Sequence, residues 1–381
     1  MNPRDGRDEG ILPVAPDAWD ALDLQGNPFL GHAFLAALED TGCVGPASGW
    51  APRHLLARDG ARLVAAVPLY EKSHSWGEFV FDFRWAEASQ AAGIPWYPKL
   101  VAAVPYTPVT GPRLLVGPGA NESARFELAG RLMDVVRASG APVAQVNFTT
   151  VEDQAALERV GFMRRHDCRF LWRNRGYRDF ADFLDRFRSD KRKKARRERR
   201  RVEEQGVEFE TLAGERVDDA LWDTVFGFSE RTFLRHGNDH YLSAGFFARV
   251  ARARPGSVMV KLARQHGVPV GAAIFFQDAH RLYGRYWGAD RAIDCLHFEA
   301  CYYQGIEWCI ERGLEEFDPG TQGEHKLARG FEPTLTRSAH WIAHPGLAAG
   351  IERWLERERA AVDEYVELAA RHLPYSREVA P

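Results

Sequence analysis

Cysteines and long apolar runs are scarce in this sequence. Its five cysteines are odd in number and widely spaced, and no Cys-x-x-Cys pair occurs, so we expect neither a disulfide framework nor a metal site. No apolar stretch reaches the roughly 18–20 residues that a membrane-spanning helix needs. The charged residues 1–10 lack the apolar core of a secretory signal. We therefore predict a cytoplasmic protein with reduced thiols and no membrane span.

Neither sign of charge is in large excess. Lys and Arg number 50 and Asp and Glu 53, a formal net charge of −3, which argues against a generally basic nucleic-acid binder. A protease triad, a phosphate-binding P-loop and a dinucleotide fingerprint are all absent from the sequence. Aromatic residues are plentiful instead, with 11 Trp and 23 Phe among 381 residues. This length predicts two domains, at roughly 100–200 residues per domain.

The first half alternates strand and helix patterns. Asn27 and Pro28 predict the start of a helix that ends near Gly42. Asp59-Gly60 between two apolar runs predicts a hairpin. Residues 78–83 have the pattern of a further strand, and the proline-rich segment 95–116 is expected to be an irregular ordered loop. Then follow a helix over 125–138, a strand over 143–148, a helix over 154–160 and a strand over 170–172.

The second half repeats this order of elements. Residues 56–74 align without gaps over 262–280, with Leu-Ala-Arg, a Val, an Ala and the last His in common. The shared order predicts a duplicated α/β domain with mixed sheets. We expect strands over 258–264, 268–276 and 281–287, a helix over 296–311, a strand over 316–318, a helical piece over 326–329, a strand over 339–342 and an amphipathic helix over 347–372.

A strongly basic segment separates the halves. Eleven of the sixteen residues 186–201 are Lys or Arg, so a helix here would present cations on nearly every face. An extended anion, such as a tRNA backbone or a nucleotide-linked precursor, would be attracted to it. We predict that Arg196, Arg197, Arg199 and Arg200 bind an anion. The alternative is a solvated helix without a ligand.

These features resemble a known family. The duplicated domain looks like tandem GNAT-type acyltransferase domains, and the basic helix that runs into Gly206 and a strand resembles the start of the second domain in Fem-type aminoacyltransferases. FemAB-like N-acyltransferases are the most similar group, and the resemblance covers residues 68–88, 96–115, 233–242, 284–290 and 301–331. It implies an α/β fold with two GNAT-like domains, at 1–178 and 179–345, and a helix and tail at 346–381.

The same resemblance implies an N-acyltransferase. An acyl or aminoacyl group would pass from aminoacyl-tRNA or acyl-CoA, a co-substrate rather than a tightly bound cofactor, to an amine acceptor that is a small molecule or a peptide precursor of the cell wall. GNAT domains that use acetyl-CoA carry a glycine-rich turn whose N–H groups hold pyrophosphate. Residues 288–300 hold one glycine and no such turn, which favours aminoacyl-tRNA. An acetyl-CoA-dependent N-acetyltransferase and a non-catalytic anion- or RNA-binding protein stay open, as does the oligomeric state.

Residues 318–326 are the best candidate for the chemistry. Asp318 ends a strand, two glycines follow, and Glu324, His325 and Lys326 enter a short helix. Open α/β sheets bind ligands in loops at the carboxyl ends of strands. Glu324 or His325 could take the proton of the amine. Lys326, which resembles in position a lysine of Fem-type second domains, could hold a phosphate or the oxyanion. The alternative is a turn whose charges complement a helix dipole.

The strand before this loop supplies candidate substrate-binding residues. Arg285, Tyr286 and Trp287 lie where a GNAT-like sheet splays, and alternation puts Arg285 and Trp287 on one side and Tyr286 on the other. Glu299 opens the next helix and could face the cleft, although an acidic first turn is ordinary in helices.

Two further segments supply substrate-binding candidates. His236 belongs to the run HGNDH, in which two histidines lie four residues apart. On a helix this spacing would suit a metal ion, but Gly and Asn disfavour a helix here, so the spacing does not indicate a metal site. Lys99, Tyr106 and Thr107 lie on the proline-rich segment. A rigid loop with polar tips suits ligand binding, and a purely structural role is the alternative.

Overall fold

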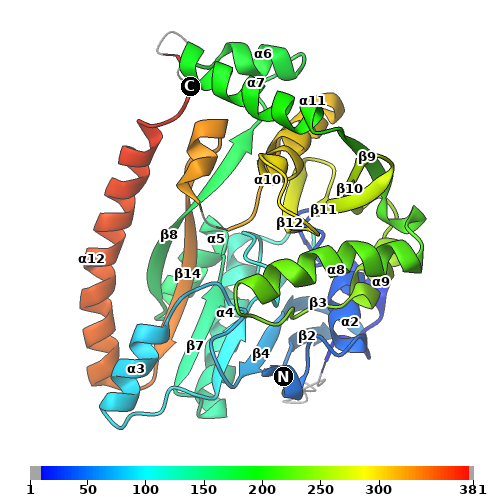
Figure 1. Cartoon of the computed structure of the whole chain (residues 1–381). Helices are drawn as coiled ribbons and strands as arrows, with labels where there is room; N and C mark the ends of the chain where they lie inside the picture. The colour runs from blue at the N-terminus through cyan, green and yellow to red at the C-terminus, as the bar shows by residue number, and fades with distance from the viewer. Residues whose placement is uncertain (1–9, 322, 377–381) are drawn as a thin grey trace. The chain divides into compact units, whose positions relative to one another are not determined.

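A computed structural model describes residues 10–321 and 323–376 of the chain (Figure 1). The fold is mixed α/β, as predicted. The described chain forms two compact units by packing. Residues 10–167 and Leu335–Glu364 make the first unit, and Cys168–Thr334 with residues 365–376 make the second.

The first unit contains two sheets. The small one joins β2 (Leu55–Asp59), β3 (Arg62–Val67) and β6 (Leu115–Val116). The larger one is antiparallel except between β5 and β7. Its strands, in order, are β1 (Trp50–Pro52), β4 (Leu69–Lys72), β5 (Lys99–Ala102), β7 (Val143–Asn147) and β14 (Glu332–Ile342).

Helices cover both faces of the larger sheet. Ala144 and Val146 of β7 pack with α4 (Glu122–Ser139) and α5 (Val151–Arg159). Val143, on the opposite face, packs with α3 (Phe83–Ala91) and α12 (Pro345–Ala370), and Figure 1 shows α12 alongside β14. Successive residues of a strand point to opposite faces, so the apolar run of β7 feeds two cores. The helices α1 (Pro16–Asp20) and α2 (His32–Asp40) precede the sheets.

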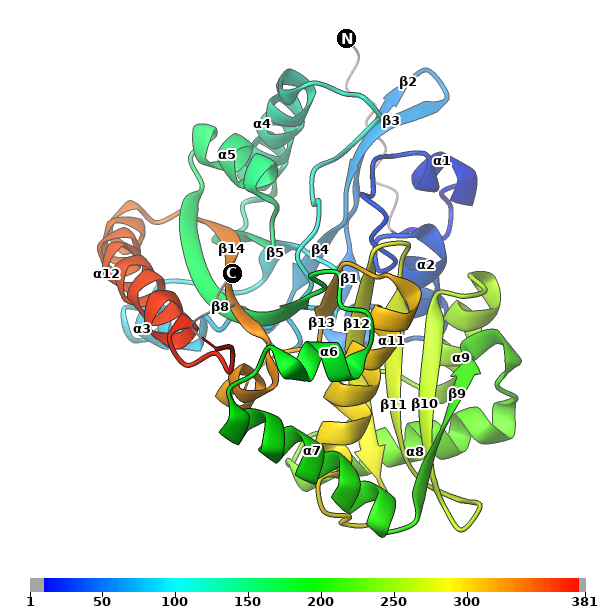
Figure 2. The same ribbon diagram turned by 90° about the horizontal axis from the view of Figure 1, so that it is seen from above.

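The second unit contains one sheet between helical layers (Figure 2). It is antiparallel except between β12 and β13. Its strands, in order, are β8 (Met163–Arg173), β13 (Glu316–Asp318), β12 (Arg281–Ala289), β11 (Val268–Gln277), β10 (Val258–Gln265) and β9 (Val207–Ala213). The helices of this unit are α6 (Phe180–Asp185), α7 (Ser189–Glu204), α8 (Asp219–Arg235), α9 (Ala244–Ala253), α10 (Leu296–Phe298) and α11 (Gln304–Arg312).

The repeat predicted from the sequence is present in the register of two hairpins. Between β2 and β3 the pairing shifts by one residue, which leaves Val64 as the extra residue of a β-bulge. Between β10 and β11 the same shift leaves Val270 as the extra residue. The ungapped alignment of 56–74 over 262–280 places Val64 on Val270. A bulge is a specific local feature, so its recurrence at aligned positions supports a duplication.

The last strand of each half belongs to the sheet of the other unit. Trp172 and Arg173 of β8 pair with β13 in the second unit, and Ser338–Ile342 of β14 pair with β7 in the first. The predicted domain boundaries at 178 and 345 concern the repeat along the sequence. These boundaries stay a prediction, because each compact unit combines segments from both halves and so does not test where one repeat ends and the next begins.

Residues 78–83 are not the strand that we predicted. Glu78 and Asp82 are buried and bond to Lys99, while Phe81 is 53% exposed. The alternation of aromatic and acidic residues is real, but the acidic side chains point inward. A helix, α3, then begins at Phe83.

Two other boundaries differ from the sequence prediction. The first long helix begins at His32 rather than near Asn27. The Asn27 side chain accepts a hydrogen bond from the N–H of Phe29, two residues on, and so holds a turn. The segment 95–116 is not wholly irregular, since it contains β5 and β6.

Candidate active site

The sheet of the second unit splays between β12 and β13. The two strands pair in parallel from Arg281 opposite Glu316 to Tyr283 opposite Asp318. Beyond this point β13 ends, while β12 continues to Ala289. The loop after Asp318 stays close to β12. A Cβ added to Gly320 would lie only 3.1 Å from the carbonyl oxygen of Gly284, which is on β12. Residues 318–326 therefore begin at the point where the strands separate.

Lys326 is buried next to this splay. It lies in the 3₁₀-helix η4 (Glu324–Arg329), is 1% exposed, and donates to the carbonyl oxygens of Gly320, at 2.7 Å, and Thr321, at 3.0 Å. Burial lowers the pKa of Lys326 to about 7, and the negative charge of Asp318 opposes this shift. Its amine thus exchanges between charged and neutral forms near neutral pH.

Asp318 holds the start of the loop. Its Oδ1 accepts from the guanidinium of Arg169, at 2.8 Å, and from the N–H of Gly320, at 2.9 Å. Asp318 and Arg169 are both buried. Sequence reasoning missed Arg169, because it lies on β8, in the first half of the sequence, and no local pattern connects it with residue 318.

His325 is exposed and fixed by two neighbours. Its Nε2 lies 2.9 Å from the hydroxyl of Tyr302. Its ring also folds over Gly323, where φ is +106° and a Cβ would lie 2.1 Å from the ring. A side chain at position 323 would displace the imidazole. Partial burial, with the positive charges of Lys326 and Arg329, lowers the pKa of His325, so the imidazole is neutral near pH 7.

Tyr302 lies on a π-helical turn, η3 (Glu299–Tyr303), between α10 and α11. Such turns occur frequently at functional sites. The ring of His297 lies 5.3 Å from that of Tyr302 and 5.7 Å from that of Trp287. Burial, with the charge of His325 if protonated, lowers the pKa of His297 to about 4. Sequence reasoning missed Tyr302, because the extra residue of a π-turn shifts the helical phase without a sequence signal.

Glu324 is exposed at the start of η4. The hydroxyl of Tyr365, on α12, donates to its Oε1 at 2.9 Å. The structure therefore gathers Asp318, Glu324, His325 and Lys326 in one loop and short helix, as the sequence order requires, and adds tyrosine hydroxyls beside His325 and Glu324.

The residues predicted on β12 point in different directions. Tyr286 packs against Phe247 of α9, with ring centroids 5.1 Å apart, whereas Trp287 faces His297 of α10. The expected alternation is interrupted at Arg285, which is the extra residue of a bulge opposite β11. Its guanidinium lies 5.8 Å from the centroid of the Tyr286 ring.

Glu299 pairs with the basic helix α7. The guanidinium of Arg199 lies 3.1 Å from Glu299 and 2.8 Å from Glu307, and it stacks 4.4 Å from the centroid of the Phe180 ring. On the same side of α7, Glu198 accepts from Arg329 and from the hydroxyl of Tyr303. The Arg199 guanidinium is therefore occupied by two carboxylates of its own unit.

The cations of α7 leave one face of the helix uncovered. Ala195, Glu198 and Val202 form a buried face, because the helix packs on the unit. Arg196, Arg197 and Arg200 are exposed, and Lys193 lies on the same side at helical spacing. We call these four residues the α7 stripe. Arg196 lies 3.4 Å from Asp185, and Arg200 lies 3.3 Å from Glu204.

Four other predicted residues belong to other segments of the chain. His236 is exposed after the end of α8. In the first unit, Lys99 is fully buried between Glu78 and Asp82, at 2.8 and 2.6 Å. Tyr106 donates to the carbonyl oxygen of Cys43, and Thr107 to that of Pro105. Their substrate-binding roles stay predictions.

Two classes of feature are not found in residues 10–321 and 323–376. No group of three or more His, Cys, Asp or Glu side chains there could hold a metal ion. Within the same ranges, every helix is too short or too polar to cross a bilayer.

Comparison with known families identifies the chain. A family model described as peptidoglycan biosynthesis/recognition matches residues 10–377. The chain belongs to the FemAB-like family. This membership supports a transferase. A comparison with curated proteins finds no significant match.

Solved structures share the fold of this FemAB-like chain at low sequence identity. One is the C-terminal domain of a protein named as a lysylphosphatidylglycerol synthetase from Agrobacterium fabrum, with a TM-score of 0.53, 12% identity, and coverage of 86% of this chain and 92% of that one. Another is L-PGS from Bacillus licheniformis, with a TM-score of 0.51, 12% identity, and coverage of 84% and 96%. FemX matches with a TM-score of 0.49 and 12% identity, over 81% and 92%.

Proposed function

We propose that this FemAB-like protein transfers an acyl or aminoacyl group to an amine acceptor, with its chemistry at residues 318–326. The proposal rests on one observation. Lys326 is buried beside the splay of β12 and β13, and its pKa is about 7. The family description supports a cell-wall precursor as the acceptor, and the fold shared with a lysylphosphatidylglycerol synthetase supports an aminoacyl group as the cargo.

In this proposal Lys326 stabilises the oxyanion. Its bonds to the carbonyl oxygens of Gly320 and Thr321 use two of the three N–H groups of the charged form. The third is available to the oxygen that becomes negative when the amine attacks the carbonyl carbon. A donor that is already oriented in a site with little water stabilises that charge more than a flexible surface lysine does.

His325 acts as the general base. Its lowered pKa keeps the imidazole neutral at pH 7, and its position at the protein surface leaves it accessible to an incoming ammonium group. The ammonium group first releases one proton to water and attacks as the neutral amine. The imidazole accepts the second proton of the nitrogen as the C–N bond forms, and the C–O bond to tRNA or the C–S bond to CoA breaks. The proton then passes to the departing oxygen or sulfur. Glu324 is the alternative base.

Aminoacyl-tRNA is the proposed donor. The only glycine of residues 288–300 is Gly288, and a Cβ there would lie 1.9 Å from the carbonyl oxygen of Phe228. This glycine is therefore required for the close packing of α8 on β12, which gives it a role other than holding a pyrophosphate. The α7 stripe offers exposed cations to an RNA backbone. Acetyl-CoA is the alternative donor.

A second candidate function is anion or RNA binding without catalysis. The exposure of the α7 stripe favours it, since Arg196, Arg197 and Arg200 stand on the outer side of the helix. In that case the residues around Lys326 would have a structural role only.

One experiment separates these functions. Purified protein is incubated with labelled aminoacyl-tRNA or acyl-CoA and with amine acceptors, products are measured by mass spectrometry, and tRNA affinity is measured in parallel. Transfer that is lost in Lys326→Met and in His325→Gln, with tRNA affinity intact, supports the enzyme, and loss in Glu324→Gln instead of His325→Gln assigns the base to Glu324. Absence of transfer from both donors, with tRNA binding that depends only on the α7 stripe, supports the second function. Transfer from acyl-CoA alone overturns the tRNA donor.

A further inference from the structure

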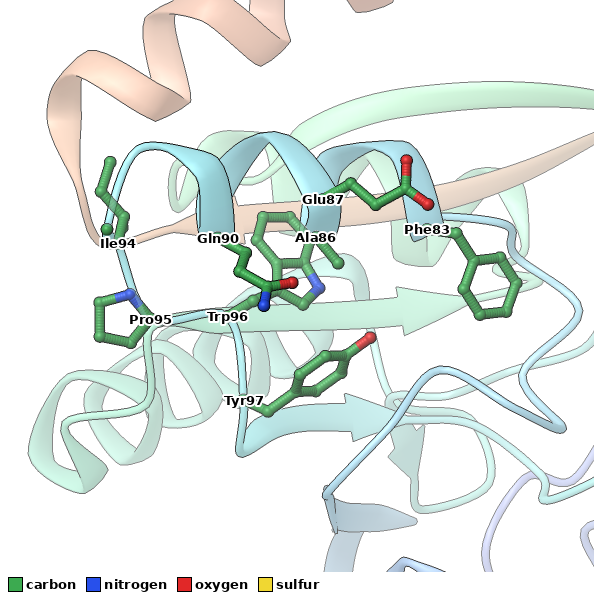
Figure 3. Close-up of a pocket in the computed structure, with 9 residues that line it drawn as sticks. Phe83, Ala86, Glu87, Gln90, Ile94, Pro95, Trp96 and Tyr97 are labelled. Atoms are coloured by element: carbon green, nitrogen blue, oxygen red, sulfur yellow. The ribbon is translucent and has the colours of Figure 1, made fainter.

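The first unit carries a pocket that contains none of the predicted site residues. Its volume is about 610 Å³, within the range of roughly 300–1,000 Å³ that is usual for small-molecule sites. The outer face of α3 and the segment after it form the walls. Figure 3 shows Glu87 and Gln90 projecting from α3, with the aromatic side chains of Phe83, Trp96 and Tyr97 along the pocket.

Buried partners hold two of these rings in place. The indole Nε1 of Trp96 donates to Asp82 at 3.1 Å, and the hydroxyl of Tyr97 lies 2.7 Å from that of Ser75. Lys99 donates to both Ser75 and Asp82, at 2.8 and 2.6 Å. The pocket wall is therefore pre-organised, which lowers the entropy lost when a ligand binds.

The charges around the pocket select for a cation. Glu87 is the one charged side chain among the nine described residues that line it. The carboxyl end of α3 also lies there, at Gln90 and Gly93, and the last turn of this helix carries no basic residue. A helix has a partial negative charge at its carboxyl end, and aromatic faces attract cations.

Lys99, a buried cation close to this wall, is compensated. The Nζ of Lys99 lies 5.6 Å from the centroid of the Tyr97 ring. Glu78 and Asp82 lie within 2.8 Å of the same Nζ, so its positive charge is balanced from within the unit. An anionic ligand would find no cationic side chain among the residues that line the pocket, which argues against nucleotides and phosphates.

We propose that this pocket binds the ammonium group of an alkylamine, such as a lysine side chain or a diamine. Glu87 and the carboxyl end of α3 attract the charge, while Phe83 and Tyr97 contact the apolar stem. This inference goes beyond the proposed transfer reaction, because it concerns binding in the first unit and holds whether or not the second unit catalyses transfer.

Calorimetric titration with three probes of matched length tests the proposal. We expect 1,5-diaminopentane to bind the full chain, 1,5-pentanediol to bind about tenfold more weakly, and glutarate to show no binding. Added salt should weaken the binding of the diamine. Equal affinity for the diol would overturn the proposal in favour of a neutral ligand such as a sugar. Absence of diamine binding in the millimolar range would also overturn it.

Two matched variants locate the binding site. Glu87→Gln should weaken diamine binding about fivefold, and Phe83→Ala should weaken it as well. Glu127→Gln removes an exposed carboxylate of α4, away from the pocket, and should leave affinity unchanged. Because Glu87 and Glu127 are both exposed on helices, neither change should impair folding. Equal effects of Glu87→Gln and Glu127→Gln would place the amine elsewhere on the surface and overturn the assignment.

Discussion

The Nζ of Lys326 lies 2.7 Å from the carbonyl oxygen of Gly320, in a loop that begins where two parallel strands part. Two backbone carbonyls hold the amine, while burial disfavours its charge and lowers its pKa to about 7. A buried lysine with a lowered pKa destabilises the folded chain. Residues with strongly shifted pKa values are frequent in functional sites.

We predict that Lys326→Met raises stability and removes transfer. The pKa of Lys326 is about 7 in the folded chain and close to 10.5 in the unfolded chain. Between these values the unfolded chain binds more protons, so the lysine makes stability rise with pH from about 7 to 10.5. Methionine should abolish that rise, increase the free energy of unfolding at pH 7, and lower kcat by about 10²–10³-fold.

Urea unfolding at several pH values, together with the transfer assay, checks this prediction. Lys326→Arg is the companion variant, since it keeps the charge at all pH values. If charged Lys326 stabilises the oxyanion, the activity of the natural protein should fall as pH rises through about 7, and this fall should be absent from any residual activity of Lys326→Arg. A Met variant that loses both stability and activity would mean that the lysine is structural.

Gly323→Ala should affect transfer more than stability. A Cβ at this position would lie 2.1 Å from the His325 ring, so the imidazole must move. Misplacement of a proton-accepting group by about 1 Å can lower the rate about 10²-fold. The matched control is Gly237→Ala, because Gly237 has a similar positive φ, +73°, and no atom within 4 Å of a Cβ. Equal kcat values for the two variants would contradict a catalytic role for the position of His325.

Lys99→Met should strongly destabilise the first unit. The change leaves Glu78 and Asp82 buried without their cation, and breaking a buried pair in this way costs about 3–5 kcal/mol. Arg264→Met, which breaks the more exposed pair with Glu210 at 2.9 Å, should cost no more than about 1 kcal/mol. Denaturant unfolding measures both changes. A similar small cost for the two would show that water reaches Lys99.

Substitutions in the α7 stripe should change the affinity for tRNA, whereas substitution of Arg199 should change the stability of the protein. Changing Arg197 and Arg200 to Gln should lower tRNA affinity and reduce the salt dependence of binding, with the log–log slope falling by about one for each cation removed. Arg199→Met should leave Glu299 and Glu307 without their partner and lower the melting temperature. Filter binding across a salt series and thermal unfolding provide the two readouts. An unchanged salt slope in the double variant would remove the stripe from RNA binding.

The residues of the candidate site were partly predictable. Asp318, Glu324, His325 and Lys326 are close in sequence, so a turn with two glycines brings them together without long-range information. Tyr302 and Arg169 were not predictable. Tyr302 faces His325 through a π-helical turn, and Arg169 reaches Asp318 from the last strand of the other half. Both depend on packing between segments more than 20 residues apart.

Local periodicity and turn residues were enough to predict most of the element order and the repeated hairpin, to which the structure adds the bulge that Val64 and Val270 share. These features depend on neighbours in the chain, whose preferences a short stretch of sequence contains. Only the tertiary structure decided that β8 and β14 are exchanged between the units, and that Glu78 and Asp82 point inward while Phe81 faces solvent. Strand partners and the pairing of buried charges are set by distant segments, because a free strand edge or a buried carboxylate is stable only when its partner is in place.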